Sequence, residues 1–384
     1  MNILEEIQNC PVEWKELGEV CEVKAGKNIN KTFIQNNLGN FPVINSGKEP
    51  LGYINIFNIQ NDPIGITSRG AGVGYVSWNE GKYFRGNLNY SATVQNDDIL
   101  LPRFLYFYLK KSSKEIENLC TFDGIPALNK SALDGLSIPI PPLEIQEKIV
   151  QILDKMTEYV TELTSELTSR KKQYSFYRDK LLSFEHEVYQ VEWKRLNEFL
   201  KKGKGTKITA SQMKLLHKEG APIRIFAGGK TYADVNYGDI PDKDIHTEEA
   251  IVVKSRGIID FEYCTEPFSF KNEFWSYSSD NENINLRYIY HYLVHNKEHF
   301  QNIANNMQMP QISSNDTEKF KIPVPSLEIQ SRIVQVLDNF DTVCNDFNIG
   351  LPKEIELRQK QYEYFRDKLL TFIAEGVYTE SRVE

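Results

Sequence analysis

The sequence lacks the features of several large protein classes. Five scattered cysteines (Cys10, Cys21, Cys120, Cys264, Cys344) form no CxxC pair, so neither a disulfide framework nor a cysteine zinc site is indicated. No run of 18 apolar residues is present to span a membrane. The first residues have neither the basic start nor the apolar stretch of a signal peptide. We therefore expect a cytoplasmic protein without membrane contact.

Catalytic motifs are also scarce. Methyltransferases that act on amino groups need a polar residue before Pro-Pro and an aromatic residue after it, but Pro141-Pro142 lies between Ile140 and Leu143. The segment 228–231 (GGKT) resembles the end of a P-loop, yet position 224 is arginine instead of the required glycine. The glycines of 69–75 (RGAGVGY) fit a strand turn better than a cofactor loop. We predict no catalytic site and no cofactor.

Three histidines have helical metal-ligand spacing. His291, His295 and His299 recur every four residues. The matching positions of the first half are Phe107, Lys111 and Glu115, so the trio is not part of the repeat described below, and we predict no metal site. The net charge is −8, which gives no general support for nucleic-acid binding but leaves room for local basic patches.

The most informative feature is a long internal repeat in the 384 residues. Two motifs recur 184 residues later: IPIPPLEIQ (138–146) returns as IPVPSLEIQ (322–330), and IVQILD (149–154) returns as IVQVLD (333–338). A third motif, QYSFYRDKLLSF (173–184), returns 188 residues later as QYEYFRDKLLTF (361–372). The repeat predicts two similar halves.

The repeated segments are helical by pattern. Apolar residues step alternately by four and three, which is the seam of a coiled coil. The seam residues are Ile149, Leu153, Met156, Val160, Leu163, Leu167, Tyr174, Tyr177, Leu181, Ile333, Leu337, Phe340, Phe347, Tyr362, Phe365 and Leu369. No glycine or proline interrupts 143–184, so we expect one helix of roughly 60 Å. Such a helix needs a partner, which the second copy supplies.

The two copies differ by four residues. In the second copy the seam passes Leu351 and Ile355 in two steps of four, which is a stutter. Gly350 and Pro352 lie at the same place. We expect a kink or a break in the second arm only.

The segments outside the helices are related more faintly. VEWKEL (12–17) matches VEWKRL (191–196), SRG recurs at 68–70 and 255–257, and RFLYFYL (103–109) matches RYIYHYL (287–293). Short β-like runs predict one compact α/β domain in each half. Because the helices match, they should bind two copies of one partner. Because the domain loops diverge, the two domains should bind two different parts of one asymmetric ligand. DNA with a bipartite site is the natural candidate for that ligand. The structural alternative is an old duplication kept only for folding.

The doubled motifs resemble a known family. P-x-LEIQ, IVQ-x-LD and KQY-x-x-x-RDKLL, in order and twice, resemble the conserved regions of the specificity (S) subunits of type I restriction–modification systems. TELTSELT (161–168) resembles the four-residue repeats of some of these proteins. The resemblance implies a non-catalytic subunit whose two target-recognition domains each read one half of a bipartite, asymmetric double-stranded DNA site. Two conserved helices would set the spacer and dock two methyltransferase subunits, with motor–nuclease subunits joining that complex.

We therefore predict a mixed α+β fold. Two similar globular target-recognition domains are separated by two long helices that form an antiparallel coiled coil, in a pseudo-two-fold internal repeat. The predicted boundaries are 1–141 for the first domain, 142–184 for the central helix, 185–325 for the second domain, 326–376 for the C-terminal helical region and 377–384 for a tail.

DNA contacts should lie on the divergent loops. Lys201, Lys202, Lys204 and Lys207 form a basic stretch, KKGKGTK, that the glycines should loosen for phosphate contact. Arg69 and Arg256 share the SRG frame, which favours a backbone or structural contact over base reading. Further loop candidates are Arg85, Asn87, Lys230 and Thr231.

Two other classes of function compete with this interpretation. A stand-alone DNA methyltransferase would transfer methyl groups as a purified chain, and the missing base-holding motif argues against it. A coiled-coil scaffold would contain the same helices without sequence-selective DNA binding.

Overall fold

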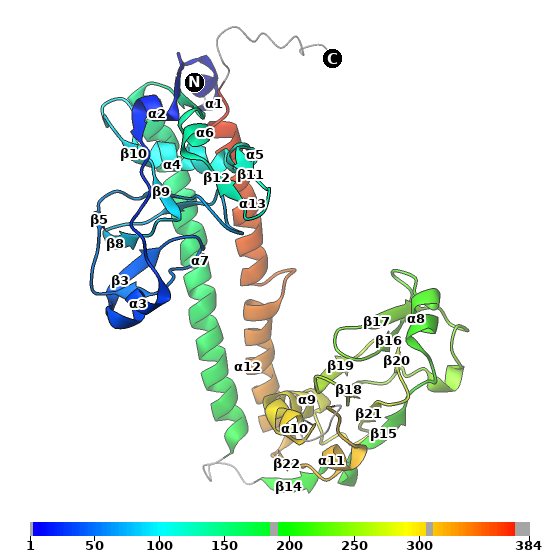
Figure 1. Cartoon of the computed structure of the whole chain (residues 1–384). Helices are drawn as coiled ribbons and strands as arrows, with labels where there is room; N and C mark the ends of the chain where they lie inside the picture. Colours follow the sequence, from blue (N-terminus) through cyan, green and yellow to red (C-terminus); the bar gives the residue numbers. More distant parts are fainter. Residues whose placement is uncertain (1–2, 185–190, 305–309, 373–384) are drawn as a thin grey trace, which may run out of the picture. The chain divides into compact units, whose positions relative to one another are not determined.

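The computed structural model describes residues 3–184, 191–304 and 310–372 of the chain (Figure 1). The predicted tail 377–384 and the first six residues of the predicted second domain lie outside this range. The chain forms two compact units, one of Met1–Leu163 with Ile355–Glu384 and the other of Thr164–Glu354. Each unit therefore contains one domain and parts of two helical segments that are distant in sequence.

The first domain alternates short strands and helices. Its helices are α1 (Ile3–Asn9), α2 (Leu17–Val20), α3 (Lys31–Asn36), α4 (Pro102–Lys111), α5 (Ser113–Asn118) and α6 (Lys130–Asp134). Its strands are β1 (Glu13–Glu16), β2 (Cys21–Glu22), β3 (Leu38–Ile44), β4 (Tyr53–Ile54), β5 (Ile59–Gln60), β6 (Ile64–Thr67), β7 (Val76–Trp78), β8 (Lys82–Arg85), β9 (Asn89–Ser91), β10 (Thr93–Val94), β11 (Cys120–Thr121), β12 (Ala127–Leu128) and β13 (Ser137–Ile140).

The second domain has a similar order of elements. Its strands are β14 (Glu192–Arg195), β15 (Lys201–Lys204), β16 (Ile223–Phe226), β17 (Tyr232–Val235), β18 (Ala250–Lys254), β19 (Asp260–Cys264), β20 (Phe268–Phe270), β21 (Trp275–Ser278) and β22 (Lys321–Val324). Its helices are α8 (Ala210–Leu216), α9 (Leu286–His295), α10 (Lys297–Ala304), α11 (Ser314–Glu318) and two 3-10 turns, η1 (Leu196–Glu198) and η2 (Asp242–Asp244).

The same sheet frame recurs in both domains. The first has sheets of order β4-β3-β8-β5 and β7-β6-β9, and the second has β17-β16-β20 and β15-β21-β18-β19. In the first domain β3 pairs in parallel with β8 and antiparallel with β4. In the second domain β16 pairs in parallel with β20 and antiparallel with β17. The faint sequence relation between the halves therefore reflects one shared topology.

Long helices follow each domain. The helix α7 (Leu143–Ser183) is continuous, as the sequence predicted, whereas the second copy forms α12 (Leu327–Asn345) and α13 (Leu351–Leu369). The predicted mixed α+β fold with two similar domains and packed long helices is confirmed. Of the described residues, none belongs to a helix that is long and apolar enough to cross a membrane.

A buried glutamine joins the first domain to α7. Gln146, the last residue of LEIQ, is inaccessible to solvent. Its amide nitrogen donates to the carbonyl oxygens of Ile99 (2.9 Å) and Pro141 (2.8 Å), and its carbonyl oxygen accepts from the Leu101 amide (2.9 Å). Three bonds to the backbone thus fix the start of α7 against the entry to α4, and no other residue type could replace both donor and acceptor at this length.

The second half repeats this junction. Gln330 is equally buried and donates to the carbonyl oxygens of Asn283 (3.1 Å) and Pro325 (2.8 Å). Its own carbonyl oxygen accepts from the Asn285 amide (2.9 Å). The repeated LEIQ motif is therefore explained by a bond set that attaches each domain to its helix.

An ion pair supports each junction about two helical turns further along the helix. Arg103 of α4 bonds Asp154 at 2.7 Å, and Arg287 of α9 bonds Asp338 at 3.0 Å. Both guanidinium groups also lie over aromatic rings of their own domain. The aspartates are the last residues of IVQILD and IVQVLD, so this part of the repeat also serves the attachment.

In the first unit, α13 packs beside the N-terminal half of α7 (Figure 1). Arg358 lies over the ring of Tyr159 at 5.3 Å. One turn later in α13, Tyr362 lies near Thr157, which precedes Tyr159. The two helices therefore run antiparallel. Burial raises the pKa of the Tyr362 hydroxyl to about 12, so this hydroxyl is neutral in the packed seam.

In the second unit, α12 packs in the same way against the C-terminal half of α7. The rings of Tyr174 and Tyr177 stack on Phe340 with centroids 5.7 and 5.8 Å apart. Leu182 shares a core with Ile333 and Leu337 of α12. Each unit thus pairs the IVQ-x-LD part of one repeat with the RDKLL part of the other.

Burial of the predicted seam residues varies along the helices. Buried residues are Ile149, Leu153, Leu163, Ile333, Leu337, Tyr362 and Leu369, and half-buried residues are Met156, Val160, Leu167, Tyr174, Leu181, Phe340 and Phe365. Tyr177 is 45% exposed although it stacks on Phe340. Phe347 is 72% exposed because it lies in the connection between α12 and α13. The break precedes Pro352, which lies in the first turn of α13, where proline is tolerated.

Candidate nucleic-acid interface

An arginine turn follows a buried strand in the first domain. Arg69 lies two residues after the end of β6 and is exposed. The Gly70 amide donates to the Pro126 carbonyl (2.9 Å), and the Leu128 amide donates to the Ser68 carbonyl (2.8 Å). Two backbone bonds therefore hold the turn on both sides of the arginine, so the backbone is fixed while the side chain faces solvent.

The second domain contains the same turn. Arg256 follows β18 and is exposed. The Gly257 amide donates to the Pro310 carbonyl (2.8 Å), and the Ile312 amide donates to the Ser255 carbonyl (3.0 Å). The SRG repeat therefore marks a backbone arrangement that both domains share and that presents one arginine in each domain.

The lysine-rich segment is not the loosened loop that the glycines suggested. Residues 201–204 form β15, which pairs along β21. Lys201 forms an ion pair with Asp280, and Lys202 bonds Glu318 and Ser314, each at 2.7 Å. These two ammonium groups are thus neutralised by carboxylates on the protein surface.

The glycines of this segment allow neighbouring parts of the chain to pack closely against its backbone. A side chain at Gly203 would collide with Ser276, and one at Gly205 would collide with the Phe270 backbone. Lys204 and Lys207 are exposed, and neither has an ion pair in the described part of the chain. Of the four lysines predicted to contact DNA, these two have charges that remain available.

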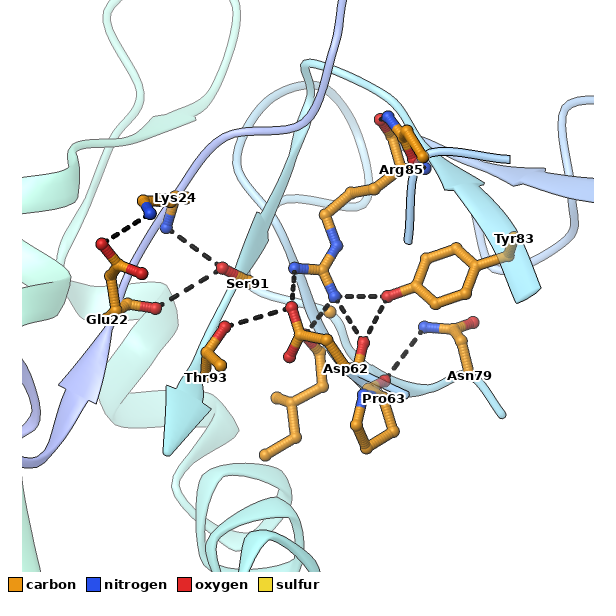
Figure 2. A network of polar contacts seen from close by, with 12 residues as sticks. Glu22, Lys24, Asp62, Pro63, Asn79, Tyr83, Arg85, Ser91 and Thr93 are labelled. Carbon is orange, nitrogen blue, oxygen red and sulfur yellow. Dashed lines mark hydrogen bonds and ion pairs between the residues drawn. The ribbon is translucent and has the colours of Figure 1, made fainter. Parts of the chain in front are cut away.

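Arg85 was predicted to lie on a DNA-contacting loop, and this prediction is wrong. It ends strand β8 and is 1% exposed. Its guanidinium donates to the Asp62 carboxylate (2.9 Å), the Asp62 carbonyl (2.8 Å) and the Ile64 carbonyl (3.0 Å), and also to the Tyr83 hydroxyl (Figure 2). Because Asp62 and Ile64 lead into β6, the network fixes the strand that carries Arg69.

The network is extended by neighbouring polar groups. The Thr93 hydroxyl donates to the Asp62 carboxylate at 3.1 Å, and the Tyr83 hydroxyl donates to the Asp62 carbonyl at 2.6 Å (Figure 2). Burial raises the pKa of Tyr83 to about 12, so the phenol keeps its proton and can act as this donor. These bonds use both terminal nitrogens of the buried guanidinium and pair its charge with Asp62, while its Nε has no hydrogen-bond partner among the described residues.

The second domain fills the equivalent place with aromatic rings. Ile44 pairs with Arg85 and Phe226 pairs with Phe270 in matching parallel ladders, so Phe270 replaces Arg85. The His246 ring packs against both Phe268 and Phe270, with centroids 5.1 and 5.3 Å away, and the two phenylalanine centroids are 6.2 Å apart. One frame therefore has two different interiors, polar in the first domain and aromatic in the second.

The remaining candidates lie in turns. Asn87 is half-buried in the turn after β8. Lys230 and Thr231 are exposed on the hairpin between β16 and β17. The structure also adds a residue that the sequence analysis missed. Lys48 is exposed on the loop between β3 and β4, and the repeat signal was too weak there to align it with Lys230.

The histidine trio does not converge on one point. His291 is buried and lies 2.7 Å from the Asp338 carboxylate, whereas His299 packs against Phe300 and Phe320. His291, Asp338 and Asp341 form the group among the described residues with metal-like geometry. However, Asp338 already accepts from Arg287, so a bound cation would lie beside a guanidinium group.

Comparisons with known proteins support the repeat. The family model described as "Type I restriction modification DNA specificity domain" matches residues 11–170 and 190–357. The chain belongs to this family. It is 32% identical to the "Type I restriction enzyme EcoR124I/EcoR124II specificity subunit" of Escherichia coli, over 97% of each chain. It is 29% identical to a putative type I specificity subunit of Mycoplasma pneumoniae, over 93% of this chain and 97% of that protein.

Solved structures support the fold. The S subunit of a type I restriction–modification system from M. genitalium matches with a TM-score of 0.71 at 19% identity, over 95% of this chain and 98% of that chain. A structure concerning "complex assembly" and "conformational transition" of the type I system matches with a TM-score of 0.54 at 15% identity, over 94% and 98% of the two chains.

Proposed function

We propose that this specificity subunit is non-catalytic and that its two domains each read one half of a bipartite, asymmetric DNA site. The helices set the spacer between the half-sites and dock two methyltransferase subunits, through which motor–nuclease subunits join. The observation that carries the proposal is the contrast between matching junctions at Gln146 and Gln330 and the different domain interiors at Arg85 and Phe270. Equal attachment suits equal partners, and unequal interiors suit unequal half-sites.

Catalysis would then belong to the partner subunits. Pro141-Pro142, which sequence analysis compared with a base-holding motif, has a structural use here. The Pro141 carbonyl accepts from Gln146, and the Pro142 carbonyl accepts from the Ile145 amide at 2.9 Å as α7 begins. These residues are committed to the domain–helix junction, which supports a purely recognising role for the chain.

DNA contacts would come from loops and strand ends with available charge. Lys204, Lys207, Asn87 and Thr231 remain candidates for phosphate or base contacts. Lys201 and Lys202 are weaker candidates because each already has a carboxylate partner.

The helices would act as a ruler. Thr164–Leu167 (TSEL) forms part of continuous α7, and four residues correspond to about 6 Å along a helix. At about 3.4 Å per base pair, deletion of these residues should shorten the permitted spacer by at most about two base pairs. The bases read at both ends should stay the same. Altered bases with an unchanged spacer would contradict the ruler.

The decisive experiment is co-expression with a candidate type I methyltransferase subunit, followed by native mass spectrometry and mapping of methylated bases in host DNA. We expect a complex of two methyltransferase subunits with one copy of this chain, and methylation at a bipartite site. Methyl transfer by the purified chain alone would instead favour a stand-alone enzyme. A complex without sequence-selective methylation would favour a scaffold.

A further inference from the structure

We propose that each domain carries a matched pair of cations for the DNA sugar–phosphate backbone: Lys48 with Arg69 in the first domain, and Lys230 with Arg256 in the second. The pairs supply affinity and orientation in both half-sites and read no bases. This inference rests on the proposed DNA-binding function and assigns it to particular residues.

The two lysines occupy one position of the shared sheet frame. Ile44 and Phe226 are equivalent because they pair with Arg85 and Phe270 in the parallel ladders. Lys48 follows Ile44 by four residues, and Lys230 follows Phe226 by four residues. Both lysines are exposed and directly follow a glycine, in the sequences SGK and GGK. The structure therefore aligns two loops whose sequences alone are too different to be matched.

Each lysine loop touches the arginine turn of its own domain. In the first domain, a side chain added at Gly72 would meet the Ser46 carbonyl oxygen at 2.9 Å. Ser46 lies two residues before Lys48, and Gly72 lies three residues after Arg69. The Lys48 ammonium also lies 5.6 Å from the ring centroid of Tyr75, which ends the same turn.

In the second domain a buried lysine makes the corresponding contact. Lys254, at the end of β18, donates to the Gly229 carbonyl at 2.9 Å and to Glu262 at 2.5 Å. Gly229 directly precedes Lys230, and Lys254 lies two residues before Arg256. The contacts between the lysine loop and the arginine turn therefore involve different atoms in the two domains. In both domains, however, the loop that carries the lysine is held against the turn that carries the arginine.

The backbone beside each arginine is open. Gly70 has φ of +97° and Gly257 has φ of +74°, and a Cβ at either place would meet no described atom within 4 Å. Glycine is needed there for its backbone conformation, while the space next to it remains available to a ligand. A phosphate with its sugar could approach the turn closely without displacing a side chain.

The charge of each pair is available for an anion. Among the described residues, no salt bridge is formed by Arg69, Arg256, Lys48 or Lys230. The Glu273 carboxylate, which interacts electrostatically with Arg256, is bonded to Lys271 at 2.6 Å. This contrasts with Lys201 and Lys202, whose charges are paired on the protein.

Both domains have the same pair of residue types, one lysine and one arginine, at equivalent positions. This favours contact with phosphates over contact with bases. The same cations on the same backbone frame cannot account for a difference between two half-sites. Contacts to phosphates carry no sequence information directly and are required at both half-sites. The pairs therefore belong to the shared, sequence-independent part of binding.

The test measures binding of fluorescein-labelled duplex DNA by fluorescence anisotropy over a series of salt concentrations. The purified complex of the chain with its methyltransferase partner, or the full chain alone, is titrated against a random-sequence duplex and a duplex containing the mapped site. The variants are Lys48→Ala with Arg69→Ala, Lys230→Ala with Arg256→Ala, and all four together. Lys130→Ala and Arg332→Ala, at exposed cations that have carboxylate partners, are controls.

Each double variant should weaken binding to both duplexes by the same factor. It should also reduce the salt slope by about 1.8, because each lost phosphate contact contributes about 0.9. The charge-preserving exchange Lys48→Arg with Arg69→Lys should keep the slope, and circular dichroism melting checks that the variants fold.

Three results separate the possible failures. If the wild-type chain and complex bind no DNA, the proposed function itself fails. If the wild type binds but the fourfold variant has unchanged affinity and salt slope, the cation pairs are wrong while the function stands. If a double variant binds the random duplex normally but changes the methylated bases, the residues read sequence and the inference is overturned.

Discussion

The two halves of the molecule are most alike where a domain meets its helix and least alike inside the domain. Gln146 and Gln330 make the same three backbone bonds, to residues at matching positions. The equivalent strands β8 and β20 instead end in Arg85 and Phe270. The comparison teaches that attachment to the helix is held constant, whereas the interior that supports the surface loops is free to change.

The two interiors solve one structural problem in different ways. In the first domain, Arg85 holds the segment from Asp62 to Ile64 by hydrogen bonds to its carbonyl and carboxylate oxygens (Figure 2). In the second, the His246 ring packs against two phenylalanine rings and lies 2.9 Å from the Lys204 carbonyl. Polar bonding and aromatic packing both fix the chain before the central buried strand, so neither is required by the fold itself.

The largest effect is expected at Arg85. Arg85→Met should destabilise the first unit by about 3–5 kcal/mol, because the Asp62 carboxylate and two carbonyl groups lose a buried partner. Urea unfolding followed by circular dichroism measures this change. Asp62→Asn in the same chain should recover part of the loss by removing the unpaired charge. A cost below about 1 kcal/mol for Arg85→Met would show that the network does not hold this domain together.

The matched glutamines should give a smaller and equal effect. Gln146→Leu and Gln330→Leu each leave two carbonyls and one amide without their partner, at a cost of about 2–3 kcal/mol. The same unfolding measurement applies to both variants. If one substitution lowers the free energy of unfolding several times more than the other, the two junctions are not energetically equivalent in spite of their equal geometry.

The sequence predicted the parts of the structure that depend on long, regular patterns. Helix α7, the interrupted second arm and the domain order follow from seam periodicity, Gly350 and the doubled motifs. The loop conformation predicted for Arg85 and for residues 201–204 was wrong because a basic residue next to glycine resembles a surface loop. Whether such a residue is buried or paired depends on distant partners, such as Asp62 for Arg85 or Asp280 for Lys201, which local sequence does not reveal.

A repeated exposed aromatic residue allows the docking role to be tested. Phe176 and Tyr364 occupy equivalent positions of the RDKLL segments and are 61% and 60% exposed. If the helices dock two copies of one partner, Phe176→Ala and Tyr364→Ala should each weaken one site about tenfold, which corresponds to about 1.4 kcal/mol. Native mass spectrometry of the co-expressed complex should show loss of one partner copy for each single variant and of both for the double variant.

A matched control distinguishes docking from general loss of apolar surface. Tyr53 is 53% exposed on β4, outside the repeated helices, and Tyr53→Ala should leave the stoichiometry unchanged. Loss of both copies from either single variant would contradict two separate and equivalent docking sites.

The smallest effect is a difference in acid sensitivity between the units. Burial lowers the pKa of His291, and this outweighs the opposing effect of the hydrogen bond that its ring donates to the Asp338 carboxylate. Because the folded pKa lies below the unfolded value, the stability that the neutral histidine provides is present above the unfolded pKa of about 6.5 and is lost as pH falls through the folded pKa. The first unit has Phe107 at this position, so only the second unit should become less stable by this route. His291→Phe should therefore reduce the decrease in melting temperature between about pH 7 and pH 5. Phe107→His, which places an imidazole near Asp154, should make that decrease larger. An equal decrease for the wild type and both variants would show that this position does not distinguish the halves.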